Sequence, residues 1–263
     1  MIKEITFPVK KLYWNGREIL REFLRNSFVD RATPCQVRRL RLNVSVSSAI
    51  EAFRAGTYAT KEPETLDWID TELADNEILF DIGANIGLYS MYAAKAHPGL
   101  KVYAFEPESL NFSRLLRNLF INGLTEAVTP LNVAIAGKTE LGFLLLSQLQ
   151  AGAALHGIGK KTETSIREGV FCSTLDDLCS KFGLPQPHHI KIDVDGLEDR
   201  IILGGASKTL NSPQLKTLLL EVSETDVKLQ PIHDFIIGCG LECVKAIVVE
   251  EKSRTTNRLY KRK

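Results

Sequence analysis

Residues 78–87 read ILFDIGANIG, an apolar run that leads directly into a glycine-containing turn. A short apolar strand followed by a turn and an amphipathic helix is typical of a parallel sheet covered by helices on both faces. Gly83 and Gly87 let the backbone turn sharply and approach a ligand closely. In doubly wound sheets, a glycine turn at this place borders the crevice that binds nucleotides. We therefore predict an α/β fold with a ligand crevice beyond this strand.

Short apolar stretches continue to alternate with amphipathic ones after this turn. The pattern predicts a helix over 88–96, a helix with Ser109 as its N-cap, and a short helix over 173–181 with Ser173 as its N-cap. Residues 150–165, rich in Gly, Ala and Lys, are predicted to form a mobile surface loop. We expect one mostly parallel sheet, with strands over 78–82, 101–105, 128–135, 141–146, 189–194, 216–222, 241–249 and 257–260.

A second motif, Phe105-Glu106-Pro107, closes the next predicted strand. Glu106 falls 19 residues after Gly87, near the spacing at which an acidic residue binds ribose hydroxyls. A carboxylate can accept from both hydroxyls, and each charge-assisted hydrogen bond contributes about 1.5–3 kcal/mol. Glu106 could instead stabilise the dipole of the following helix. Together with the glycine turn, it predicts a nucleotide-like ligand.

The residues around the turn indicate which ligand this is. A dinucleotide brings a pyrophosphate to the fingerprint Gly-x-Gly-x-x-Gly, whereas the spacing here is Gly-x-x-x-Gly. Asp81 precedes the first glycine, and its negative charge opposes a pyrophosphate. The charge suits a ligand that carries an ammonium and a sulfonium group, and S-adenosyl-L-methionine has both. The chain also lacks Gly-x-x-x-x-Gly-Lys-Ser/Thr, the phosphate-binding loop of ATPases.

A third motif, KIDVDGLE at residues 191–198, ends the predicted fourth strand. Asp193 and Asp195 share one side of an extended segment, and Glu221 and Glu224 end the neighbouring strand. Such acids could deprotonate a hydroxyl or hold a divalent cation such as Mg²⁺. Asp195 and Glu198 could instead cap a helix. We therefore predict Asp193 and Asp195 as catalytic residues, with Asp193 the stronger candidate.

These motifs resemble the FkbM-type methyltransferases. The resemblance runs from about residue 54 to the C-terminus and leaves the first 50 residues uncovered. Its motifs occur in the expected order, which makes it specific. The resembling stretches are 60–69, 79–90, 104–107, 173–178, 190–198 and 218–222.

The resemblance implies the Rossmann-like class I methyltransferase fold, a seven-stranded, mostly parallel sheet with one antiparallel strand. It implies S-adenosyl-L-methionine as donor and O-methylation of a sugar or secondary-metabolite hydroxyl. By position, the methionine part would be held by Asp81, Gly83, Asn85 and Gly87. The adenosine part would be held by Phe105, Glu106 and Pro107, with Glu106 on the ribose and Ala134 near the adenine. Asp193 would lie beside the transferred methyl group.

The N-terminal residues differ in character from the rest. Residues 1–41 carry ten Lys or Arg against four Asp or Glu, and residues 252–263 carry six basic residues and no acid. Helices are predicted over 14–28 and 46–55. We therefore expect a helical extension over 1–56 and a methyltransferase domain over 57–263. The basic ends are either solvated or attracted to an anionic substrate or a membrane surface.

Other features concern the location of the protein. No apolar stretch approaches the roughly 20 residues needed to span a bilayer, and the N-terminus lacks the apolar core of a secretory signal. The five cysteines are scattered and odd in number, which favours buried or free thiols over a zinc site or a disulfide framework. These features predict a cytoplasmic protein.

Four alternatives stay open from the sequence. An NAD-dependent dehydrogenase is disfavoured by Asp81 and the missing third glycine. A nucleic-acid methyltransferase fits the basic ends, but the chain has no Asn/Asp-Pro-Pro-Tyr/Phe segment for amino methylation of a flipped base. The others are a non-catalytic cofactor-binding module and a peripheral membrane enzyme acting on lipid-linked glycan through the basic N-terminal helix. Association into a homo-oligomer is also compatible with the sequence.

Overall fold

The computed structural model describes residues 31–146, 152, 166–194, 196–250 and 254–263. Its centre is a seven-stranded sheet in the order β11-β12-β10-β9-β3-β4-β5. β12 runs antiparallel to both neighbours, and the pairs from β10 to β5 are parallel. The predicted mostly parallel sheet with one antiparallel strand is therefore confirmed. The strands are β3 (Ile78–Ile82), β4 (Lys101–Phe105), β5 (Val128–Leu131), β9 (His189–Ile192), β10 (Thr217–Ser223), β11 (Leu241–Glu250) and β12 (Thr255–Arg262).

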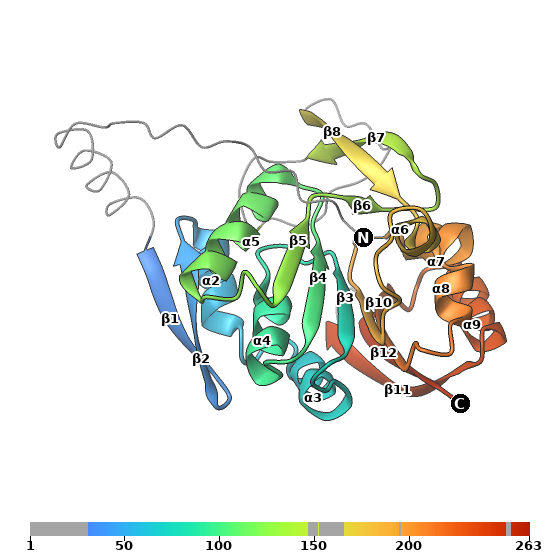
Figure 1. The fold of residues 1–263 in the computed structure, drawn as a ribbon, viewed down its shortest axis with the longest axis horizontal. Helices are drawn as coiled ribbons and strands as arrows, with labels where there is room; N and C mark the ends of the chain where they lie inside the picture. Colours follow the sequence, from blue (N-terminus) through green and yellow to red (C-terminus); the bar gives the residue numbers. More distant parts are fainter. Residues whose placement is uncertain (1–30, 147–151, 153–165, 195, 251–253) are drawn as a thin grey trace.

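Helices cover both faces of this sheet, as the apolar strands require (Figure 1). Successive strand residues point to opposite faces, so Leu79 packs in one hydrophobic cluster and Phe80 in the other. One face carries α2 (Ala49–Thr57), α3 (Pro63–Glu72), α4 (Leu88–Ala96) and α5 (Ser109–Ile121). The other carries α6 (Leu175–Ser180), α7 (Glu198–Gly205), α8 (Ser207–Asn211) and α9 (Leu229–Gly238).

The prediction of a helical N-terminal extension is wrong over residues 31–46, whereas the helix predicted over 46–55 is confirmed as α2. Residues 31–46 form an antiparallel hairpin of β1 (Arg31–Val37) and β2 (Leu40–Val46), followed by α2. Leu42 and Val44 are buried on either side of partly exposed Asn43, and they pack in the same core as Leu79 of β3. The helix predicted over 14–28 lies outside the described residues, and the domain boundary after residue 56 stays a prediction.

The stretch predicted as one strand over 128–135 is two strands in different sheets. The chain leaves β5 at Asn132, whose side-chain amide donates to the carbonyl oxygens of Glu106 and Pro107, at 2.9 Å each. Ala134 then pairs with β8 in a second sheet, of order β6-β8-β7. Its strands are β6 (Ala134–Ile135), β7 (Glu140–Leu146) and β8 (Ile166–Ser173), of which β8 was not predicted.

Two predicted N-caps are displaced by one residue. Glu108, rather than Ser109, caps α5 by accepting from the backbone N–H groups of Leu110 and Asn111. Thr174, rather than Ser173, caps α6. The loop predicted over 150–165 lies outside the described residues, apart from Gly152. Within the described residues, no helix is long and apolar enough to cross a membrane.

Candidate active site

The glycine turn, Gly83–Gly87, joins β3 to α4 at the carboxyl edge of the sheet. The backbone N–H groups of Gly83 and Ala84 both donate to the carbonyl oxygen of Phe105, at 3.0 Å. Gly83, Asn85 and Gly87 have positive φ angles of 81°, 51° and 86°. A Cβ on Gly83 would lie 1.9 Å from the carbonyl oxygen of Asp193. Glycine is therefore required here because the turn packs against the segment after β9.

Gly83→Ala is expected to lower the melting temperature by roughly 6–12 °C. The collision with Asp193 and the left-handed φ together should cost about 3 kcal/mol, and each kcal/mol shifts a domain of this size by about 2–4 °C. Thermal unfolding followed by circular dichroism measures the change. Gly123→Ala is the control, since Gly123 also has a positive φ but a Cβ there meets no atom within 4 Å. Equal shifts in the two variants would contradict the packing argument.

Glu106 is 5% exposed and is held by backbone groups on both sides. Its Oε2 accepts from the N–H of Asn85 at 2.7 Å, and its Oε1 accepts from the N–H of Glu108 at 3.0 Å. Burial raises the pKa of Glu106 to about 8, although these two N–H donors favour the ionised form. The carboxyl group is thus fixed in position and has acceptor capacity left for a ligand.

Two adjoining cavities lie beside the glycine turn. The main chamber, of about 170 Å³, has an apolar wall and a polar one. The side chamber, of about 40 Å³, is bordered by the charged residues Glu62 and Lys191. Both chambers share Arg54, Lys61, Gly83, Asn85 and Asp193. The apolar wall of the main chamber consists of Phe105, Pro107, Val133, Ala134 and Leu144. An elongated ligand with an apolar ring at one end and charges at the other fits this pair of cavities.

Three acids meet where the chambers join. Carboxylate oxygens of Glu62, Asp193 and Glu221 lie within 4.8 Å of one another. Burial opposes ionisation of Asp193, but the Lys191 ammonium, 2.7 Å away, outweighs it and lowers the pKa of Asp193. Burial and the charge of Asp193 raise the pKa of Glu221 to about 8. The two neighbouring carboxyl groups therefore differ in protonation. Asp193 is ionised at neutral pH, whereas Glu221 titrates close to neutral pH.

Asp81 lies behind the turn, buried at 1% exposure. Its Oδ2 accepts from the Ser90 hydroxyl at 2.5 Å, and its Oδ1 has no hydrogen-bond partner in the described part of the chain. Burial raises the pKa of Asp81, and the charge of Lys191 opposes this. An unpaired buried acceptor costs about 1–3 kcal/mol, so a donor from a bound ligand or a water is expected there.

The structure brings most of the predicted site residues together. The predicted residues that line the main chamber are Gly83, Asn85, Phe105, Glu106, Pro107, Ala134 and Asp193. Asp81 and Gly87 are not among the residues lining either described chamber, and a Cβ on Gly87 would instead meet Leu115 at 2.3 Å. Asp195 lies outside the described residues. The roles given to these residues stay predictions.

Several residues of the chambers were not predicted from the sequence. Arg54, Lys61 and Glu62 come from the segment before β3. Lys61 and Glu62 stand in the stretch 60–69 that resembles the family, so a signal was present without an assigned role. Lys191 stands in the third motif, and its 3% exposure could not be read from the sequence.

The acids at the junction have oxygen donors of the kind that Mg²⁺ prefers. Two of them are already ion-paired, Glu62 with Lys61 at 2.8 Å and Asp193 with Lys191 at 2.7 Å. The protein's own ammonium groups therefore compensate much of the negative charge. The divalent cation expected from the sequence stays a prediction.

Comparisons with known proteins agree with this geometry. Residues 81–243 match the Methyltransferase FkbM domain. The 31-O-demethyl-FK506 methyltransferase FkbM of Streptomyces tacrolimicus is 26% identical over 204 residues, which cover 66% of this chain and 75% of that protein. The hexuronic acid methyltransferase AglP of Haloferax volcanii is 25% identical over 193 residues, covering 67% and 76%.

A solved structure shares the fold. The protein PH0793 of Pyrococcus horikoshii, provisionally named a transferase, superimposes with a TM-score of 0.50 at 11% identity, covering 88% of this chain and 70% of that one. The matched family domain spans more than half of the chain and contains the glycine turn, Glu106 and Asp193. The chain therefore belongs to the FkbM methyltransferase family and is an S-adenosylmethionine-dependent methyltransferase with a Rossmann-like fold.

Proposed function

We propose that this methyltransferase acts on a hydroxyl oxygen of a small molecule or glycan. The observation that carries the proposal is the pair of unlike carboxyl groups, Asp193 and Glu221, at the junction of the two chambers. An alcohol is a poor nucleophile at neutral pH, so its methylation needs a group that accepts the hydroxyl proton. The names of two relatives, which refer to a 31-O position and to a hexuronic acid, support an oxygen acceptor of this kind.

The residues of the chambers fit S-adenosylmethionine, which supplies an electrophilic methyl group when bound. Glu106 would accept hydrogen bonds from the ribose hydroxyls, and Phe105, Pro107 and Ala134 would contact the adenine part. The charged side chamber suits an amino acid, which carries both an ammonium and a carboxylate.

Asp193 and Glu221 would have different roles in the reaction. Asp193, kept ionised by Lys191, would stabilise positive charge beside it. Glu221, in its ionised form, would accept the proton of the acceptor hydroxyl while the oxygen–carbon bond forms and the sulfur–carbon bond breaks. The proton would then leave Glu221 for solvent. Asp195, the other predicted catalytic residue, lies two residues after Asp193 in the sequence and stays a candidate in this proposal.

Calorimetry and a methyl-transfer screen test the proposal in two stages. Micromolar binding of S-adenosylmethionine and S-adenosylhomocysteine, with no binding of NADH, is expected from the charge pattern at the turn. Methyl groups labelled with tritium should then appear in members of a panel of sugars, uronic acids and hydroxylated secondary metabolites. Binding without transfer to any oxygen acceptor, but with transfer to amines or nucleic acid, would overturn the hydroxyl proposal.

The affinity for S-adenosylhomocysteine is expected to rise with pH through Glu106. Ribose hydroxyls donate best to the ionised carboxylate, and a pKa of about 8 means that the ionised fraction rises from about 0.1 at pH 7 to about 0.75 at pH 8.5. Calorimetry should therefore show binding that is about eightfold tighter at pH 8.5. Glu106→Gln should bind weakly and show no such rise. A flat profile in the wild type would contradict the pH argument.

The other expectations about partners keep their standing as predictions. The membrane-surface proposal depends on the basic helix over 14–28, which lies outside the described residues. Methylation of lipid-linked glycan, absence of nucleic-acid binding, homo-oligomerisation and the cytoplasmic location likewise stay predictions.

A further inference from the structure

Two asparagines, Asn118 on α5 and Asn122 at its C-cap, hold the N-terminal hairpin in matching ways. Asn122 accepts from the backbone N–H of Asn43 at 2.8 Å and donates to the carbonyl oxygen of the same residue at 2.7 Å. Asn118, one helical turn earlier, accepts from the N–H of Ser45 at 2.8 Å. Both side chains therefore hold β2 through backbone groups.

Among the described hydrogen bonds, Asn118 has a contact with the glycine turn, and Asn122 has none with it. The amide of Asn118 donates to the carbonyl oxygen of Ile86, inside the glycine turn, at 2.8 Å. Asn118 is fully buried, so both bonds are shielded from water. The next residue back in the turn, Asn85, donates its N–H to Glu106. The turn is thus held from one side by Glu106 and from the other by Asn118.

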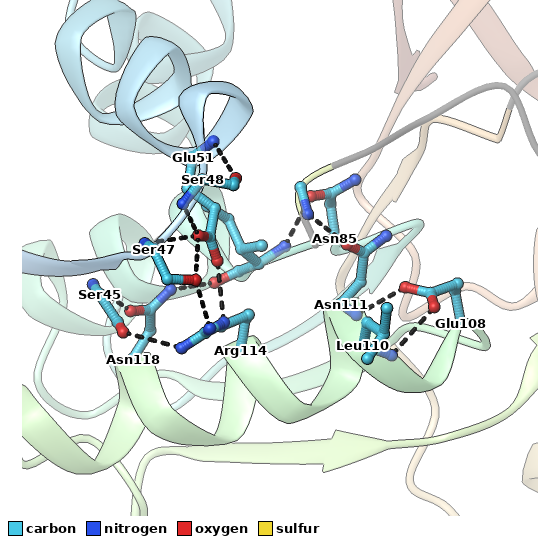
Figure 2. Close-up of polar contacts among 12 residues, drawn as sticks. Ser45, Ser47, Ser48, Glu51, Asn85, Glu108, Leu110, Asn111, Arg114 and Asn118 are labelled. Carbon is cyan, nitrogen blue, oxygen red and sulfur yellow. Dashed lines mark hydrogen bonds and ion pairs between the residues drawn. The ribbon is translucent and has the colours of Figure 1, made fainter. Parts of the chain in front are cut away.

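The hairpin leads into α2, whose Arg54 lines both chambers. A second contact ties this segment to α5, because buried Glu51 pairs with Arg114 at 2.9 Å and also accepts from the N–H groups of Ser47 and Ser48 (Figure 2). Figure 2 shows Asn118 and Arg114 pointing from the same helix toward the segment that carries Ser45 and Glu51. The segment before the matched family domain is therefore fastened beside the turn.

We propose that Asn118 is a positioning residue for cofactor binding, which sets the shape of the glycine turn by tying it to the N-terminal hairpin. Asn118 lines neither of the two chambers and would act through the Ile86 carbonyl. Because Ile86 lines the side chamber but not the main one, the effect should fall on the amino-acid part of the cofactor rather than on adenosine. This inference rests on the proposed assignment of the two chambers.

The test compares Asn118→Ala with Asn122→Ala, each of which removes hairpin contacts, at a temperature where both are folded. Calorimetry with two probes separates positioning from general loosening, since 5′-methylthioadenosine lacks the amino-acid part of S-adenosylhomocysteine. Asn118→Ala should bind S-adenosylhomocysteine about tenfold more weakly, because one buried hydrogen bond contributes about that much. Its affinity for 5′-methylthioadenosine should change by less than about twofold. Asn122→Ala should change neither affinity by more than about twofold.

Equal affinities of the two variants for S-adenosylhomocysteine would overturn the inference, as would an equal loss for both probes in Asn118→Ala. Wild-type protein that binds neither probe would overturn the proposed function and this inference with it. If Asn118→Ala does not fold, Asn118→Asp at pH 8 keeps the acceptor for Ser45 and removes the amide donor to Ile86. The same selective weakening is expected of it, and unchanged binding would overturn the inference.

Discussion

Replacing Glu221 by glutamine is expected to slow methyl transfer by about 10²–10⁴-fold, the usual contribution of a general base. Glutamine keeps the size of the side chain but cannot accept the hydroxyl proton. The wild-type rate should rise with pH and level off above about 8, because the base works only when ionised and its pKa is about 8. The variant should lose this rise. Initial rates with an acceptor from the screen, measured between pH 6 and 9.5, give both quantities.

Glu224→Gln provides the matched control for this prediction. Glu224 lies three residues after Glu221, directly after the end of β10. Its carboxylate is held by Arg258 and Thr256 and does not line the described chambers. Its replacement should change the rate by less than about threefold, as expected for a partly exposed ion pair away from the reaction. A wild-type rate that does not rise with pH up to about 8, or an unchanged rate in Glu221→Gln, would exclude Glu221 from the mechanism.

Asp193→Asn is expected to lower turnover by about 10³-fold while leaving the affinity for S-adenosylhomocysteine nearly intact. The substitution removes a fixed negative charge beside the reacting groups and leaves buried Lys191 without its ion-pair partner. Binding of S-adenosylmethionine, which is a sulfonium, should weaken more than binding of its neutral thioether product. Single-turnover rates and calorimetry with both ligands measure these effects.

A double variant separates the two causes. In Lys191→Met/Asp193→Asn the uncompensated ammonium is also removed, so any loss due to that charge should be recovered. Turnover that stays low would assign the loss to the missing carboxylate. Near-normal turnover in Asp193→Asn itself would exclude Asp193 from the reaction.

The sequence predicted the centre of the fold more closely than its edges. β3, α4 and β4 have the predicted bounds, because a buried strand, a positive-φ glycine turn and a helix each leave a local signal. The hairpin was missed because its apolar alternation is short and contains Pro34, a residue disfavoured within strands. β8 was missed because its exposed positions include Phe171, which obscures the alternation.

The residues of the candidate site were likewise predictable only where the local sequence places them. Glu106 and Asp193 follow strands directly, and strand order places their ends at one edge of the sheet. Lys61 and Glu62 reach the site only through the packing of α3, which no local spacing encodes. The unlike behaviour of Asp193 and Glu221 depends on the buried ammonium of Lys191 and on distances between strands. Such effects arise from tertiary structure.

The three acids at the junction come from distant parts of the chain, at positions 62, 193 and 221. During synthesis, the glycine turn and Glu106 emerge from the ribosome long before β9 and β10, whose pairing brings Asp193 and Glu221 together. A nascent chain would therefore have the elements of the proposed nucleoside site before the carboxyl groups proposed to accept a proton come together. Because domains assemble non-local strand pairs late, catalytic competence should appear in one step with completion of the sheet.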